Sequence, residues 1–242
     1  PTLSGANLRV TGTTHLEVSA AFVAGSGSID LVHSGSVLRV AGGTGTVNLN
    51  GTRLLGRGWI AGNLAGQPVL EPGGSATGSL RITRAWSPSG GQLVADIGSA
   101  SAYDAVVVGT GADLDAVALT VTADPAYVPD SGDHFDVVTA GSITSPFLTT
   151  ALPAFADHTA IVETSPIDVI VWITDCDAET RHPGADLKDE SLAGEVLRGC
   201  DLAEADLGFA DLTDVDFTNA NLTHANLAGA TLAGATWSNT TC

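Results

Sequence analysis

Residues 185–242 read ADLKDESLAGEVLRGCDLAEADLGFADLTDVDFTNANLTHANLAGATLAGATWSNTTC, with a large apolar residue at every fifth position. The eleven positions are Leu187, Leu192, Leu197, Leu202, Leu207, Leu212, Phe217, Leu222, Leu227, Leu232 and Trp237. A small residue, usually alanine, stands two residues before most of them. A five-residue period fits neither an α-helix nor a flat strand. It predicts a backbone that turns a corner every five residues, with the large and the small residue both facing inward.

Four such corners close a square coil that stacks on copies of itself. The run resembles the pentapeptide-repeat family, whose signature is A-(D/N)-L-x-x. The resemblance covers residues 185–242 and implies a right-handed, four-sided β-helix with the central Leu or Phe and the preceding Ala inside. Glu190 and Glu195 depart from the pattern, because they occupy the small inward position. Since a buried unpaired carboxylate is costly, we expect the first coil to be distorted or open to solvent there.

The chain before the repeats consists of short β-rich runs, such as residues 8–10, 37–40 and 46–49, separated by Gly, Ser, Thr and Asn. No helical period intervenes, so this part is predicted to be all-β. Residues 58–147 resemble the β-helical passenger region of autotransporters and related bacterial surface proteins. The shared features are Pro72-Gly73, Tyr103-Asp104 before an apolar strand, and DSGDHF at residues 130–135. This resemblance implies a right-handed parallel β-helix and an exported protein, with no particular activity.

The sequence therefore predicts an all-β chain in three parts. A right-handed parallel β-helix covers residues 1–173, and a four-sided pentapeptide-repeat β-helix covers residues 185–242. Between them, residues 174–184 (TDCDAETRHPG) are polar and end in Pro-Gly, which indicates a linker or cap. No amphipathic capping helix is evident at either end. We expect the open ends either to continue in a longer polypeptide or to pair with neighbouring subunits.

The charge of the chain is −18, with twenty Asp, seven Glu and a single Lys. Such a chain is not expected to bind nucleic acid or anionic lipid, and no apolar run is long enough to cross a membrane. The acidity has two interpretations, a solvated anionic coat or a set of Ca²⁺ ligands. Asp130, Asp133 and Asp136 form the densest candidate metal site. No other cofactor is expected.

The three cysteines, Cys176, Cys200 and Cys242, are an odd number. Cys176 lies just outside the repeats and Cys200 at an inward position of the first coil, so the two are a candidate disulfide that seals the end of the coil. Cys242 either fills the interior or pairs with something beyond this chain. Three reduced thiols would weaken an extracellular assignment, which otherwise follows from the resemblance to exported proteins and from an export signal already removed.

No catalytic motif of a known hydrolase, nucleotide-binding or metal-dependent class occurs in the sequence. Asp113 and Asp115 would share one face of a strand, where β-helix polysaccharide-degrading enzymes carry clustered carboxylates. On an acidic protein such a pair is more often a solvated face. Trp59, Trp86 and Trp172 form either a sugar-stacking platform or packing in the core and at sheet edges.

These observations favour a non-enzymatic extracellular β-solenoid, a subunit or stalk of a surface fibre that assembles end to end. Its expected partner is a second copy of itself or another surface protein. The alternatives are an adhesin or glycan-binding surface module, and a β-helix polysaccharide-degrading enzyme.

Overall fold

The computed structural model describes residues 2–3, 5–18, 22–155, 158–176 and 181–242. The described residues form strands and turns with one short 3₁₀ segment, so the predicted all-β fold class is confirmed. The strands and the 3₁₀ segment are β1 (Thr2–Leu3), β2 (Ala6–Val10), β3 (His15–Val18), β4 (Phe22–Ala24), β5 (Gly27–Leu31), β6 (Val37–Val40), η1 (Ala41–Gly43), β7 (Thr46–Gly56), β8 (Trp59–Ala61), β9 (Asn63–Pro72), β10 (Ser79–Ile82), β11 (Trp86–Pro88), β12 (Gln92–Ser99), β13 (Ala102–Tyr103), β14 (Ala105–Ala112), β15 (Ala118–Ala123), β16 (His134–Ile143), β17 (Thr149–Ala151), β18 (Thr159–Thr164) and β19 (Asp168–Thr174).

The chain divides into two compact units. Unit 1 comprises Pro1–Val128, Phe135–Pro153 and Val162–Val171. Unit 2 comprises Pro129–His134, Ala154–Ile161 and Trp172–Cys242. The repeats of unit 2 are thus accompanied by two segments that lie before residue 173 in the sequence. No described helix is long and apolar enough to cross a lipid bilayer.

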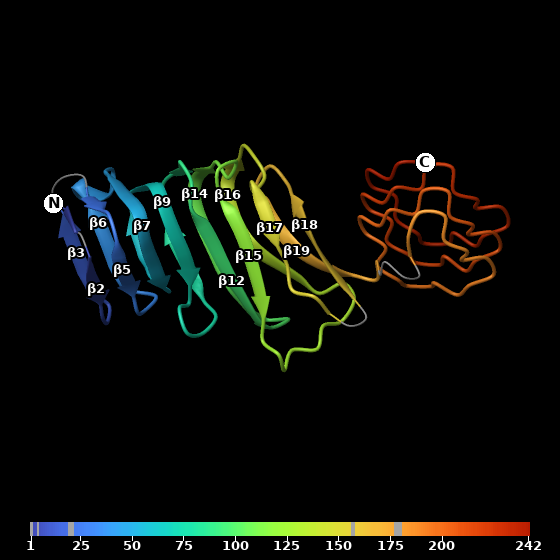
Figure 1. Cartoon of the computed structure of the whole chain (residues 1–242), viewed down its shortest axis with the longest axis horizontal. Coiled ribbons are helices and arrows are strands. Elements are labelled where there is room, and N and C mark those ends of the chain that lie inside the picture. The colour runs from blue at the N-terminus through green and yellow to red at the C-terminus, as the bar shows by residue number, and fades with distance from the viewer. Residues whose placement is uncertain (1, 4, 19–21, 156–157, 177–180) are drawn as a thin grey trace. The chain divides into compact units, whose positions relative to one another are not determined.

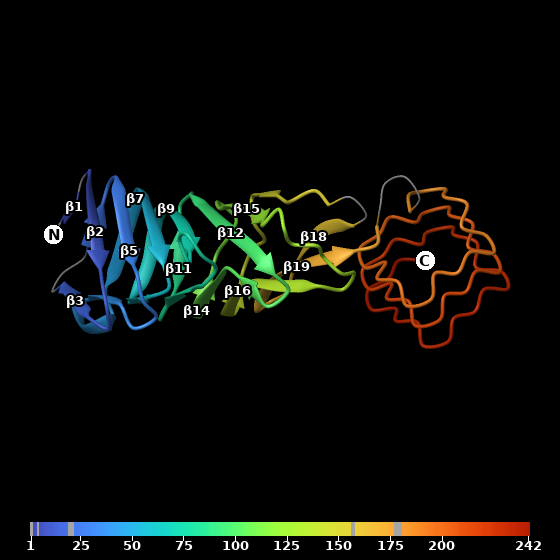
Figure 2. The same cartoon turned by 90° about the horizontal axis from the view of Figure 1, so that it is seen from below.

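Unit 1 is a parallel β-helix with three columns of strands (Figures 1 and 2). One column runs β1–β4–β7–β9–β11, the second β2–β5–β7–β9–β12–β15–β17, and the third β3–β6–β8–β10–β14–β16–β19. In the third column Val37 pairs with Trp59 and Trp59 with Arg81, an advance of 22 residues per rung. Each rung therefore places its residues directly above those of the rung before it.

The core of unit 1 follows from strict alternation along these strands. In β12 the residues Leu93, Ala95 and Ile97 are buried, and the residues between them are more exposed. The register then places buried aliphatic residues of successive rungs above one another, as Leu38 pairs with Ile60. Burying one such side chain stabilises the fold by about 1.5–3 kcal/mol. The interior of unit 1 is therefore a continuous apolar column.

Unit 2 is a square coil in which β-bridges join residues 20 positions apart, as in Asp186–Asp206 and Ser191–Asp211. Each face ends in a residue with left-handed backbone, two positions after the large apolar residue, and Gly184 has the same conformation just before the first of them. These residues are Gly184, Asp189, Gly194, Gly199, Glu204, Phe209, Asp214, Asn219, His224, Gly229, Gly234 and Asn239. This conformation turns the corner, and it is the physical basis of the five-residue period.

Outward side chains of unit 2 form ladders between successive coils. Asn221 donates to Asp201 at 2.8 Å and Asn226 donates to Asp206 at 2.7 Å. Thr236 donates to Asp216 at 2.8 Å. At these three positions a carboxylate in one coil accepts a hydrogen bond from an amide or hydroxyl in the next, so like charges do not meet there.

The corner glycines give a direct test of this geometry. Gly229 has φ +77°, and a Cβ atom there would lie 2.5 Å from the Phe209 ring. Gly194 has φ +80° and open space around it. Gly194→Ala is expected to lower the free energy of unfolding by about 1–2 kcal/mol, because alanine is strained in the left-handed conformation. Gly229→Ala should lower it clearly more, because the Phe209 ring must also move. Urea unfolding of the two variants measures the difference, and equal losses would contradict it.

Candidate functional site

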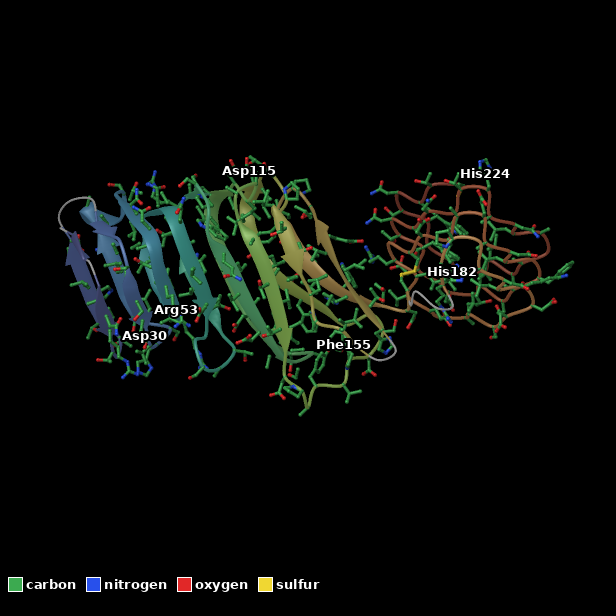
Figure 3. All side chains as sticks on the ribbon, in the orientation of Figure 1. Asp30, Arg53, Asp115, Phe155, His182 and His224 are labelled. Atoms are coloured by element: carbon green, nitrogen blue, oxygen red, sulfur yellow. A yellow bond between two sulfur atoms is a disulfide. The ribbon has the colours of Figure 1, made fainter. Side chains whose placement is uncertain are left out.

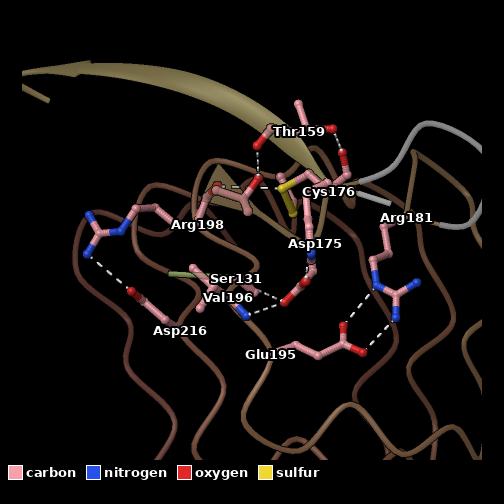
Figure 4. Close-up of a disulfide and its surroundings, with 12 residues drawn as sticks. Ser131, Thr159, Asp175, Cys176, Arg181, Glu195, Val196, Arg198 and Asp216 are labelled. Carbon is pink, nitrogen blue, oxygen red and sulfur yellow. Dashed lines mark hydrogen bonds and ion pairs between the residues drawn. A yellow bond between two sulfur atoms is a disulfide. The ribbon is translucent and has the colours of Figure 1, made fainter. Parts of the chain in front are cut away.

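A disulfide and a cluster of polar contacts close the first coil of unit 2 (Figure 4). Cys176 and Cys200 form a disulfide across 24 positions of sequence. Asp175 donates its backbone N–H to Val196 O at 3.0 Å, and its Oδ2 accepts the Val196 N–H at 2.8 Å. Ser131 donates to the same Oδ2 at 2.7 Å. The segment before the repeats is therefore joined to the coil covalently and by backbone pairing.

The two glutamates that depart from the repeat pattern take different positions in this end. Glu195 accepts two hydrogen bonds from the Arg181 guanidinium, at 2.8 and 2.6 Å. Glu190 is exposed. The first coil is thus open to solvent at Glu190, as expected, and closed by an ion pair at Glu195. The repeat pattern does not indicate this partner, because Arg181 lies outside the repeats.

Burial of the apolar ladder decreases along unit 2. Its residues from Leu187 to Leu222 are at most 5% exposed. Leu227 is partly buried, Leu232 is 40% exposed and Trp237 is 36% exposed. Cys242 is an exposed free cysteine, so the interior position proposed for it from the sequence is wrong.

The structure does not assemble the predicted metal site. Asp133 Oδ2 accepts the backbone N–H of Asp130 at 3.1 Å, so this carboxylate stabilises the turn in which it lies. Asp136 lies in β16 beside inward-facing Phe135 and Val137. Among residues 2–3, 5–18, 22–155, 158–176 and 181–242, no three His, Cys, Asp or Glu side chains gather as metal ligands do.

The candidate acid pair and sugar platform are not assembled either. Asp113 and Asp115 follow the end of β14 at Ala112 and lie outside the strands, Asp115 in a turn (Figure 3 labels Asp115). The sequence pattern failed here because it does not show where a strand ends.

Of the three tryptophans, Trp86 is fully buried in the core. Trp172 packs against His134 and the Arg198 guanidinium. Trp59 is 39% exposed, with the Arg81 guanidinium 4.9 Å from its ring centroid. The packing alternative therefore describes Trp86 and Trp172, and Trp59 is a partly exposed residue that contacts Arg81.

Charge is distributed unequally along the stacked rungs of unit 1. Residues 1–84 contain six of the nine basic residues and three acidic residues, a net charge of +3. Residues 85–242 contain three basic and 24 acidic residues, a net charge of −21, and residues 85–180 contain no Lys or Arg. Because the rungs follow the order of the sequence, unit 1 is basic in its first rungs and acidic in the later ones. The anionic coat inferred from composition is wrong for the first 84 residues.

A groove of about 600 Å³ lies on the basic rungs (Figure 3 labels Asp30 and Arg53). Arg9, Arg53 and Arg57 line it, together with Leu55 and the turn at residues 73–76. Arg9 Nε lies 3.2 Å from Asp30 Oδ2, and Arg53 forms a two-point ion pair with Glu71, which raises the pKa of Arg53. Arg57 is exposed and forms no ion pair with a described residue. The groove thus has three cations, two anions and the apolar residues Val32, Leu55 and Ala76.

A buried carboxylate lies on the other side of the turn at residues 73–76. Asp104 is 2% exposed and accepts the backbone N–H groups of Gly78 at 2.7 Å and of Asp96 at 3.2 Å. Burial raises the pKa of Asp104 to about 7. The two hydrogen bonds and the charge of Arg57 oppose this shift without cancelling it. The group holds its proton well above the pH at which an exposed aspartate ionises.

This shift predicts a pH dependence of stability. The unfolded chain releases the Asp104 proton near pH 3.8 and the folded chain near pH 7, so stability from this group falls as the pH rises through that range. Asp104→Asn removes the group that titrates. The melting temperature of this variant should therefore fall less between pH 5 and pH 8 than that of the wild type. Asp115→Asn, an exposed turn residue, is the matched control. Identical slopes in all three proteins would contradict the prediction.

Comparison with known proteins bears on the repeats. Residues 184–219 and 220–241 match the family model described as Pentapeptide repeats (8 copies), which covers about a quarter of the chain. No curated protein matched the chain. The autotransporter resemblance of residues 58–147 stays a prediction. The pentapeptide-repeat resemblance predicted for residues 185–242 is confirmed, and this C-terminal part of the chain is a pentapeptide-repeat β-solenoid.

Proposed function

We propose that this protein is a non-enzymatic structural β-solenoid of the cell surface, a fibre subunit whose copies associate head to tail. The observation that carries the proposal is the charge division along the rungs, +3 over residues 1–84 and −21 over the rest. Opposite charges on two parts of one surface attract between copies and repel when like parts meet. Two copies therefore attract when the basic part of one meets the acidic part of the other, which is the head-to-tail orientation.

Two further features support a structural role outside the cell. The interior of both units is built mainly from buried apolar side chains, as in a structural column. The Cys176–Cys200 disulfide suits an oxidising compartment, since such bonds are rare in the cytosol. Pentapeptide-repeat solenoids supply a stable column on which surface residues, and not interior ones, meet partners.

Salt dependence tests the proposal. Because exposed charges are screened within about 10 Å at 0.1 M salt and about 3 Å at 1 M, association should be strong at low salt and lost near 1 M. Sedimentation velocity and electron microscopy of the purified protein, at several NaCl concentrations, measure it. We expect elongated assemblies at low salt that disperse as salt is added. A protein that stays monomeric at every salt concentration would overturn the proposal.

A further inference from the structure

An apolar residue projects from the acidic part of unit 1. Val128 is 83% exposed, the most exposed large hydrophobic residue among those described. The turn before it is fixed, because Tyr127 N–H donates to Asp124 O at 2.9 Å and Ala126 N–H donates to Asp124 Oδ1 at 2.8 Å. The Tyr127 ring packs edge-on against Phe135. A hydrogen-bonded turn thus presents one apolar side chain four residues after Asp124, in a stretch from residue 85 to residue 180 that has no Lys or Arg.

The basic groove has the complementary features. Leu55 is a partly exposed apolar residue within it, and Arg9, Arg53 and Arg57 bring an excess of positive charge. Its volume of about 600 Å³ is ample for a valine side chain. Every residue that lines the groove lies between Arg9 and Ala76, so the Val128 turn of the same copy does not occupy it.

We propose that the groove at Arg57 receives the Val128 turn of a second copy of this chain. Charge complementarity selects the occupant, since the turn contains Asp124 and the groove contains Arg57, whose guanidinium forms no ion pair with a described residue. Burial of Val128 would remove apolar surface from water on both partners. The inference rests on the proposed self-association and identifies its joint. The groove and the turn lie on different rungs of one unit, so the contact joins two different surfaces of the two copies. Such a heterologous contact repeats from copy to copy and forms a filament unless the copies close into a ring.

Charge reversal on each half tests the joint. Val128→Lys places a cation on the turn, where the wild-type side chain has no packing role. Arg57→Glu places an anion in the groove. Each variant alone should weaken association at low salt by about tenfold or more, because like charges then meet. An equimolar mixture, or the double variant, should restore association, because Lys and Glu then face one another. Arg84→Glu makes the same change in net charge outside the groove and is the matched control.

The outcomes separate this inference from the proposed function. If the single variants lose association and the mixture regains it, while Arg84→Glu changes the dissociation constant less than about twofold, the joint is established. If the wild type associates and both single variants match it, the groove is not the joint and the proposed function stands. If the mixture fails to recover, the pairing is overturned. If the wild type does not associate at any salt concentration, the proposed function itself falls. Circular dichroism and melting temperature show that each variant is folded.

Discussion

Replacing Leu212 with aspartate is expected to unfold unit 2. Leu212 is fully buried in the middle of the ladder, between coils that pair with it on both sides. The change removes a buried leucine and places an unpaired carboxylate in an apolar interior, a combined loss above about 4 kcal/mol. Since whole domains are stable by about 5–15 kcal/mol, a coil unit of this size has little reserve. Trypsin should then cleave after Lys188 and Arg198, which the intact coil protects.

Leu232→Asp is the matched control, because it makes the same chemical change at the same position of the repeat. Leu232 is 40% exposed, so its carboxylate stays in water. We expect the trypsin resistance of this variant to remain close to that of the wild type. If Leu212→Asp is equally resistant, the ladder is not the core of unit 2.

Loss of the disulfide should be the second largest effect. The cross-link between Cys176 and Cys200 spans 24 positions of sequence. It restricts the unfolded chain, so in the chain-entropy model its removal lowers the free energy of unfolding by about 3 kcal/mol. Ala replaces Cys200 without disturbing the repeat, because alanine fills the equivalent inward positions at Ala205 and Ala210. The Cys176→Ala, Cys200→Ala double variant should therefore unfold at a clearly lower urea concentration, followed by tryptophan fluorescence.

Two controls isolate the cross-link. Cys242→Ser should leave the urea midpoint unchanged, because Cys242 is exposed and unpaired in the structure. Adding a reductant to the wild type should lower its midpoint to that of the double variant. A midpoint insensitive to both treatments would show that the Asp175–Val196 backbone pairing closes the coil without help from the disulfide.

The repeats were predictable from sequence because one residue type recurs in phase. The period fixed the inward positions, and it also brought Cys200 inward beside Cys176, which made the disulfide a specific hypothesis. The β-helix of unit 1 followed from short alternating runs without helical pattern. In both cases the information lies in residues close together in the sequence.

The features that escaped sequence reasoning depend on contacts between distant residues or on where strands end. Arg181 pairs with Glu195 across a corner of the coil, and no local pattern links them. Asp104 owes its raised pKa to burial between two rungs. Asp113 and Asp115 were predicted to be strand residues, but β14 ends at Ala112, before both of them. The difference in charge between residues 1–84 and 85–242 can be counted from the sequence, but the net charge of the whole chain does not show it.

The ladder of outward side chains limits how such a coil changes length in evolution. Deleting five residues keeps leucines inside but shifts every later residue by one face, so Asn226 would leave Asp206 and Asn221 would leave Asp201. Deleting or duplicating 20 residues keeps every remaining residue on its own face, so the inward positions stay inward and the pairs outside the changed coil are kept. Insertions and deletions in this unit should therefore be tolerated in whole coils, and lineages that gained or lost length should differ by multiples of 20 residues.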